Sequence, residues 1–126
     1  MEDLQSLVLE LKAGLDAGQE LQELYDHDMW DIEDPKFEKI RHIHIHLSIT
    51  VGKLARLIEP IDHKYHHGEA VPHGDLLREM GPILADVLMH CLQLANLGDT
   101  TLSDMLLSRY RQNAARFAPE SVFGQL

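Results

Sequence analysis

Aliphatic residues recur at three- and four-residue spacing along the first 25 residues, which is typical of one face of a helix. This spacing predicts an N-terminal helix over residues 1–25. Gly14 and Gly18 each weaken such a helix by about 1 kcal/mol relative to alanine, so we expect it to pack against the rest of a bundle or another subunit. The acidic stretch 26–35 follows and ends at Pro35. Its like charges and its proline predict a loop.

The next segment, residues 36–61, fits two patterns. Apolar and polar residues alternate across 41–51, as they do in a half-buried strand. Apolar residues also fall at helical spacing over the longer stretch 40–58, and this second pattern continues past Gly52, where the alternation stops. We therefore predict a helix that ends near Pro60, although the pattern alone leaves the strand open.

Punctuating residues divide the following stretch. The polar, histidine-rich residues 61–74 predict a loop, and residues 75–80 predict a short helix. Gly81-Pro82 then interrupts the pattern, and Pro82 suits the first turn of a new helix. The helix that follows is apolar almost all round and ends at Gly98. We expect it to be the buried central helix of the fold.

A last helix is predicted before Pro119. Thr101 and Asp104 have the spacing of a capping box at its start. No internal repeat or domain boundary is evident, so the chain is predicted to form a single all-α domain over residues 1–126, a bundle of four to five helices.

Length and charge limit the classes of partner. The chain has 126 residues, enough for one domain with a modest core, and 44% of them are hydrophobic. The formal net charge of −10 disfavours nucleic acid and anionic membranes, because both repel an acidic protein. It does not exclude a single nucleotide whose phosphates are carried by a divalent cation.

Cysteine usage and hydropathy indicate the compartment. The lone Cys91 leaves no disulfide framework, so a reducing environment is expected. Acidic residues stand near the N-terminus, where a secretory signal needs basic ones, and no apolar run approaches the roughly 20 residues that span a membrane. We therefore expect a cytoplasmic protein without a membrane partner.

One carboxylate in the apolar central helix is the most informative candidate for chemistry. Asp86 shares a stripe with His90 and Gln93, at spacings of four and seven residues. A buried carboxylate costs much free energy unless a cation, hydrogen-bond donors or a metal ion meets it. Asp86 is therefore either part of a satisfied ion pair or a ligand of a metal or phosphate site. Glu79 joins the same stripe only if the helix runs unbroken through Pro82.

Three segments resemble the MazG-like nucleoside-triphosphate pyrophosphohydrolases. The sequence LADVL at 84–88 and LQLAN at 92–96 is similar to the third-helix signature of that family, where an E-x-x-D pair helps bind magnesium. The sequence VGKLA at 51–55 is similar to its V-G-E-L-A segment, which lies within an E-E-x-x-E motif. The resemblance covers residues 36–118. In its C-terminal part the matching positions are Arg109, Asn113, Arg116 and Phe117.

The resemblance implies a MazG-type helical bundle that forms a homodimer or homotetramer. It also implies a nucleoside triphosphate as ligand, magnesium as cofactor, and hydrolysis to the monophosphate and pyrophosphate. Trp30 in the acidic loop either covers the core or stacks on the base. The candidate substrate-binding residues are Trp30, Lys53, Arg109, Asn113 and Arg116.

The departures from the family pattern bear on catalysis. Ile49, Thr50 and Lys53 stand where the first acidic motif is expected. Ile83 replaces the glutamate of the second motif, which leaves Asp86 alone. One carboxylate cannot hold the two or more magnesium ions of the family's mechanism. We therefore expect Lys53 to pair with Asp86 in a nucleotide-binding protein with weak or lost hydrolysis. The alternative is a non-catalytic regulatory or interaction module.

The histidines offer a different route to a site. His42 and His46 share one face of a helix, and in a strand His44 would point the same way. Imidazoles suit a transition metal such as zinc, nickel, manganese or iron. Alternatively these residues are polar positions on an amphipathic element. The candidate metal ligands are His42, His46, Glu79, Asp86 and His90.

Overall fold

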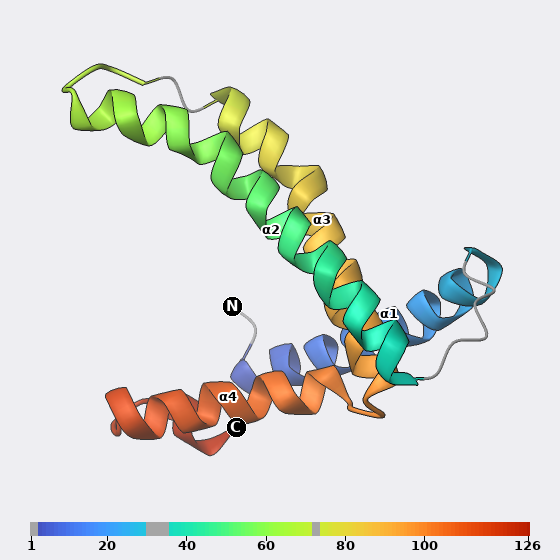
Figure 1. Cartoon of the computed structure of the whole chain (residues 1–126). Helices are drawn as coiled ribbons and strands as arrows, with labels where there is room; N and C mark the ends of the chain where they lie inside the picture. Colours follow the sequence, from blue (N-terminus) through green and yellow to red (C-terminus); the bar gives the residue numbers. More distant parts are fainter. Residues whose placement is uncertain (1–2, 30–35, 72–73) are drawn as a thin grey trace. The chain divides into compact units, whose positions relative to one another are not determined.

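The computed structural model describes residues 3–29, 36–71 and 74–126, and every regular element among them is helical. The all-α fold class is thereby confirmed, with four long helices and one short 3₁₀ helix (Figure 1). In chain order these are α1 (Leu4–Met29), α2 (Lys36–His66), α3 (Gly74–Leu97), α4 (Leu102–Phe117) and η1 (Val122–Gln125).

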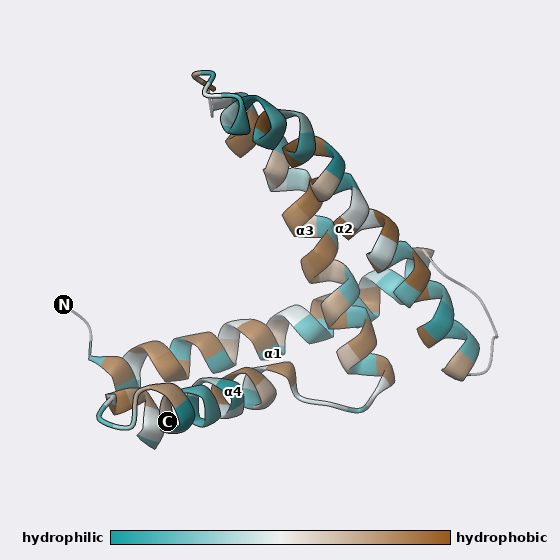
Figure 2. Ribbon diagram, turned by 60° about the vertical axis from the view of Figure 1, so that its left-hand side comes forward, coloured by the Kyte–Doolittle hydropathy of each residue, from teal (hydrophilic) through white to brown (hydrophobic). Residues whose placement is uncertain are grey.

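The chain forms two compact units. One unit combines Met1–Ile32 with Ala95–Leu126, and it holds α1, the last turn of α3, α4 and η1. The other unit is Glu33–Leu94, which consists of α2 and most of α3 as a helical hairpin. In Figures 1 and 2 the two helices of this hairpin lie side by side.

The first helix is longer than predicted. Residues 26–29 belong to α1, so this part of the predicted acidic loop is wrong. Acidic residues at 26 and 28 point about 200° apart around a helix, which keeps their charges separated. In addition, the Gln22 amide donates a hydrogen bond of 2.9 Å to the Asp26 carboxylate one turn later. Trp30 and the rest of that loop, 30–35, lie outside the described residues.

For the segment that fits both a strand and a helix pattern, the structure shows the helix: residues 41–51 are helical and belong to α2. The predicted end near Pro60 is wrong, since the helix continues to His66. Proline removes one helical hydrogen bond, to the carbonyl of Arg56 four residues earlier. Arg56 is exposed, so water can satisfy that carbonyl and the loss is small enough for the helix to continue.

The last turns of α2 carry pairs of opposite charge at helical spacing. Carboxylate oxygens of Glu59 and Asp62 lie 3.6 Å and 3.5 Å from the ring nitrogens of His63 and His66. Gly68 follows with a φ of +76°, a left-handed conformation that ends the helical turn. The predicted loop over 61–74 is thus helical in its first six residues.

Helix α3 runs unbroken through Gly81-Pro82, so the predicted interruption there is wrong. The carbonyl that loses its partner belongs to the exposed Arg78 and can be hydrated. Two consequences follow. The first is that Glu79 and Asp86 share one continuous helix. The second is that α3 is long and apolar enough, by length and composition, to cross a membrane. Core helices of water-soluble proteins pass the same test. The cytoplasmic location stays a prediction.

The first unit joins α1 to α4, which run antiparallel and side by side (Figure 2). Thr101 is the N-cap residue of α4, but its side chain makes no capping hydrogen bond. Instead Gln19 of α1 accepts a hydrogen bond of 2.7 Å from the Leu102 backbone N–H and donates one of 2.9 Å to the Thr100 carbonyl. The capping box predicted for Thr101 and Asp104 is therefore wrong, because a side chain of another helix takes its place.

A polar cluster supports the same contact. The fully buried Ser103 donates a hydrogen bond of 2.6 Å to the Asp16 carboxylate. Lys12 lies 2.9 Å from Asp104 and 3.5 Å from Asp16, measured from its ammonium nitrogen to a carboxylate oxygen. The hydrogen bond with Asp104 raises the pKa of Lys12 above its ordinary value of 10.5. Asp104 thus forms an ion pair between α1 and α4 and does not take part in a cap within α4.

Apolar burial within the chain is slight. In the described part of the chain the buried hydrophobic residues are Ile43, Leu92, Ala95 and Ala114. The prediction that the central helix is buried is wrong, because Leu77, Leu84 and Leu88 of α3 are 66%, 48% and 49% exposed. Figure 2 shows such hydrophobic bands along all four helices. The helices thus keep apolar surface that a further partner can bury.

Candidate functional site

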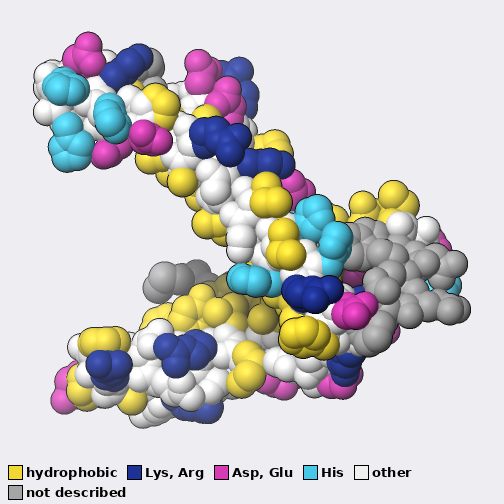
Figure 3. Space-filling model, viewed as in Figure 1, with side chains coloured by type: hydrophobic (Ala, Val, Ile, Leu, Met, Phe, Trp, Pro, Cys, Tyr) yellow, Lys and Arg dark blue, Asp and Glu magenta, His cyan; other side chains and the backbone are white. Residues whose placement is uncertain are grey.

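The α2–α3 hairpin carries an open groove of about 340 Å³ with charged residues on its edge. Lys53 and Arg56 line it from α2, one helical turn apart, and Glu79 lines it from α3. The half-buried Leu57 and Ile83 supply its apolar lining. Figure 3 shows basic and histidine side chains gathered along α2 with hydrophobic side chains between them.

This combination suits a phosphorylated ligand with an apolar part. A lysine ammonium and an arginine guanidinium together bind phosphate oxygens strongly, and the guanidinium does so through two parallel hydrogen bonds. The groove also brings two cations next to a single carboxylate, so it has a local positive charge on a chain of net charge −10. Electrostatic attraction therefore favours an anion in this groove, although the chain as a whole is acidic.

The predicted Lys53–Asp86 pair is not formed. Both side chains are exposed, and the described residues include no ion pair between them. Asp86 does lie on the stripe of Glu79, two helical turns further along α3. The physical reason for the difference is that this side of α3 faces water, so the carboxylate has no burial cost that a lysine must offset.

The replaced motif positions take structural roles or face solvent. Thr50 is 5% exposed, so its hydroxyl cannot reach a ligand in the groove. Ile49 is half-exposed on α2, and Ile83 belongs to the apolar lining of the groove. Carboxylates at these positions would have made an acidic site, whereas the residues present make a basic one.

His46 lies near both of the other histidines predicted as ligands, His42 and His90. The rings of His42 and His46 are 4.5 Å apart, centre to centre, and meet edge to face. The ring of His46 lies 6.4 Å from that of His90 on α3. With the side chains as they stand, residues 3–29, 36–71 and 74–126 contain no group of three or more His, Cys, Asp or Glu arranged to hold a metal ion. Glu79 lies on the charged groove instead.

The predicted C-terminal substrate contacts belong to the other unit, on the exposed face of α4. Arg109 donates hydrogen bonds to Gln112 at 2.9 Å and to Asn113 at 3.4 Å. The Arg116 guanidinium lies over the Phe117 ring, 4.9 Å from its centre. These contacts are all within one helix, so a role of Arg109, Asn113 and Arg116 in substrate binding stays a prediction.

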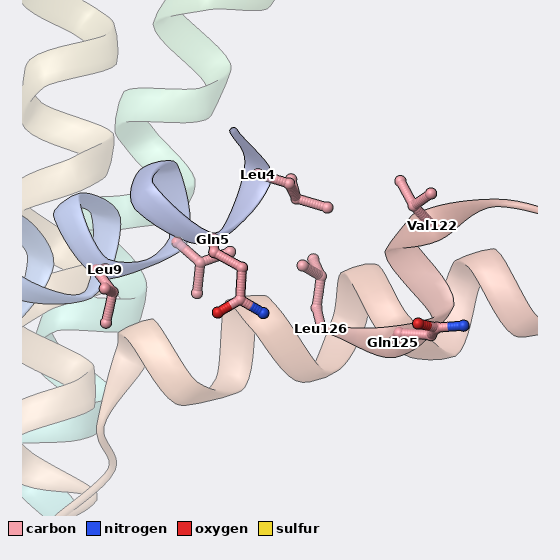
Figure 4. Close-up of a pocket in the computed structure, with 7 residues that line it drawn as sticks. Leu4, Gln5, Leu9, Val122, Gln125 and Leu126 are labelled. Carbon is pink, nitrogen blue, oxygen red and sulfur yellow. The ribbon is translucent and has the colours of Figure 1, made fainter. Parts of the chain in front are cut away.

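A second cavity, of about 230 Å³, lies between the start of α1 and the C-terminal end of the chain (Figure 4). Leu4, Leu9, Val122 and Leu126 line it together with the polar Gln5 and Gln125. No charged side chain lines it. Its polar groups are the uncharged amides of Gln5 and Gln125, so the α2–α3 groove with its charged side chains is the better candidate for a functional site.

One charged residue of the candidate site was not predicted from the sequence. Arg56 lines the groove beside Lys53, and the three-residue spacing that places both on one helix face is visible in the sequence. In a helix, this spacing identifies Arg56 as a neighbour of Lys53. The inclusion of Glu79 in a site depends on an unbroken α3, whereas the sequence pattern predicts a break at Gly81-Pro82.

No family model matches the chain, and no match is found among the curated proteins or the solved structures. The likeness to the MazG-like enzymes thus rests on the sequence segments alone. The function is therefore argued from the groove and its charges.

Proposed function

We propose that this chain is a MazG-like helical protein that binds a nucleoside triphosphate or a related nucleotide on its α2–α3 hairpin, with weak or lost hydrolysis. The observation that carries the proposal is the groove in which Lys53 and Arg56 face the ligand space beside Glu79. The two cations suit the phosphates, and Leu57 and Ile83 suit the less polar sugar and base.

Magnesium does not fit this groove as a resident cofactor. Magnesium is held by carboxylates and water in an octahedral shell, and the groove offers one carboxylate against two cations. The ammonium of Lys53 and the guanidinium of Arg56 repel a divalent ion but bind the phosphates directly. Binding without turnover follows, because one carboxylate beside two cations cannot hold the pair of metal ions that would activate water and the leaving group.

A mutational binding experiment tests this assignment. ATP binding is measured by equilibrium titration for the wild-type chain and for the Lys53→Met and Arg56→Met variants. We expect each variant to bind at least about tenfold more weakly, since each loses a charge-assisted contact. Lys64→Met is the matched control, because Lys64 is an exposed lysine near the end of the same helix. Unchanged ATP affinity in both site variants would overturn the assignment.

A second candidate function, a homo-oligomeric interaction module, is favoured by the opposite side of the hairpin. Val51 and Ile58 on α2 lie between about 140° and 200° around the helix from Lys53. On α3, Leu84 and Leu88 lie at similar angles from Glu79. Since Lys53 and Glu79 border one groove, these apolar residues lie together on the side away from it. The apolar patch consists of Val51, Ile58, Leu77, Leu84 and Leu88.

We propose a second copy of this chain as the partner of this patch. Its five residues are 50%, 38%, 66%, 48% and 49% exposed, in sequence order. Burying that surface is worth about 4 to 7 kcal/mol per subunit, taking 1.5–3 kcal/mol for a whole aliphatic side chain. A two-fold contact brings the same patch from both subunits and doubles the gain, which reaches the range needed to offset the loss of freedom on association.

A further inference from the structure

We propose that His42, His46 and His90 form a binding site for a zinc-like transition metal ion, separate from the nucleotide groove. Two of the ligands come from one face of α2 and the third comes from the neighbouring α3. Imidazole nitrogen is the preferred ligand type for zinc, nickel and copper in proteins. The site concerns a different ligand from the phosphate groove, so each proposal can fail without the other.

Two of the ring separations can be compared with those of a tetrahedral metal site. Zinc–nitrogen bonds of about 2.0–2.1 Å at tetrahedral angles place two imidazole ring centres about 5 Å apart. The observed separations are 4.5 Å for His42 and His46 and 6.4 Å for His46 and His90. These values lie on either side of the required one. His42 and His46 are exposed, and the proposed site requires their side chains to rotate toward His90 when the ion binds.

His90 is held in the form that a metal needs. Its Nδ1 lies 2.9 Å from the Gln93 amide oxygen. Because that oxygen is an acceptor, Nδ1 carries the proton and donates it, which leaves the lone pair of Nε2 available to a metal ion. Gln93 is 4% exposed, so burial fixes the group that orients the ring. Metal-binding histidines are typically oriented by such a hydrogen bond to the other ring nitrogen.

The surroundings supply a further ligand and a favourable charge. Asp86 lies one helical turn before His90 on the same stripe of α3 and is exposed, so its carboxylate or a water molecule can complete the coordination. The chain's net charge of −10 also raises the local concentration of cations. Because the rings converge only on binding, we expect weaker affinity than in a preformed structural zinc site.

Zinc titration of the untagged full chain, without nucleotide, tests the site. Calorimetry measures stoichiometry and affinity, and the visible absorption of added Co²⁺ reports whether the coordination is tetrahedral. We expect one ion per chain with a tetrahedral cobalt spectrum. His46→Ala, which removes the ligand that neighbours both others, should weaken zinc binding at least about tenfold. His46 is exposed, so this variant is expected to fold.

Two further variants make the test specific. His63→Ala is the control, since His63 is exposed near the end of α2 and pairs with Glu59; its zinc affinity should equal that of the wild type. Gln93→Leu should weaken binding while His90 is still present, as expected of a positioning residue, provided that circular dichroism shows an intact helical fold. Wild-type affinity in His46→Ala, loss of binding in His63→Ala, or no zinc binding by the wild type would each overturn the proposal.

Discussion

The Gln19 side chain of α1 accepts a hydrogen bond from the Leu102 backbone N–H at 2.7 Å, so one helix provides the N-terminal cap of another. The same side chain donates to the Thr100 carbonyl at 2.9 Å and to the Asn96 amide oxygen at 3.0 Å. Asn96 returns a hydrogen bond of 2.9 Å to the Gln19 carbonyl. The start of α4 is therefore fixed by long-range contacts with α1 and not by its own first turn.

Replacing this cap should destabilise the chain. We expect Gln19→Leu to lower the free energy of unfolding by about 1–3 kcal/mol, because it leaves partly buried backbone groups at Leu102 and Thr100 without a partner. Urea denaturation measures the change. Gln5→Leu is the matched control, since Gln5 is exposed on the same helix, and it should change stability little. Equal stability of the two variants would show that the cap contributes nothing.

The continuity of α3 has a direct consequence for Pro82. Within a helix, proline costs up to about 3 kcal/mol relative to alanine, because it removes a hydrogen bond and crowds the preceding turn. We therefore expect Pro82→Ala to raise the free energy of unfolding by about 1–3 kcal/mol in urea. A first-turn proline of a separate helix would instead be favourable. Loss of stability in Pro82→Ala would thus contradict the unbroken helix.

The contact between α1 and α4 should depend on pH in the alkaline range. The hydrogen bond with Asp104 raises the pKa of Lys12 above 10.5. A raised pKa means that the folded state binds the proton more tightly, so the stabilisation is complete below 10.5 and is lost as the pH rises through the raised value. We expect the stability difference between wild type and Lys12→Met to shrink between about pH 9 and pH 12. A difference that stays constant or grows over this range would exclude the ion pair as its cause.

The apolar patch of the hairpin should control association. Leu84→Lys introduces a charge into the centre of the proposed two-fold contact, so we expect a monomer where the wild type is a dimer or tetramer. Light scattering after size-exclusion chromatography measures the mass. Ile45→Lys is the control, because Ile45 is 50% exposed on α2 outside the patch. Loss of association in the control alone, or a monomeric wild type, would rule out this face.

The helices of this chain are largely visible in its sequence, and the errors have common physical causes. Helical spacing over 40–58 outweighed the alternation within 41–51, as the structure confirms. The sequence pattern predicts helix breaks at Pro60 and Pro82, yet each proline removes only one hydrogen bond, to a carbonyl that water can reach. Whether a helix tolerates that loss depends on exposure, which a linear pattern does not contain.

The candidate site was only partly predictable for a related reason. The family motif points to Lys53, and the spacing to Asp86 points to Glu79; both residues line the groove. Asp86 was expected to be buried because its helix is apolar almost all round. It is exposed, because within one chain only part of α3 is covered. The burial of an apolar helix depends on which elements pack against it. An apolar side that its own chain leaves exposed can also be covered by a second subunit.

The most direct test of the central claim is the dissociation constant of ATP measured in EDTA and again in magnesium. If Lys53 and Arg56 hold the phosphates directly, we expect ATP to bind at least as tightly in EDTA, because magnesium neutralises charge that the two cations would otherwise bind. Pyrophosphate should stay undetectable in both conditions. Binding that is lost in EDTA and restored by magnesium, with release of pyrophosphate, would contradict the claim and indicate an active metal-dependent enzyme.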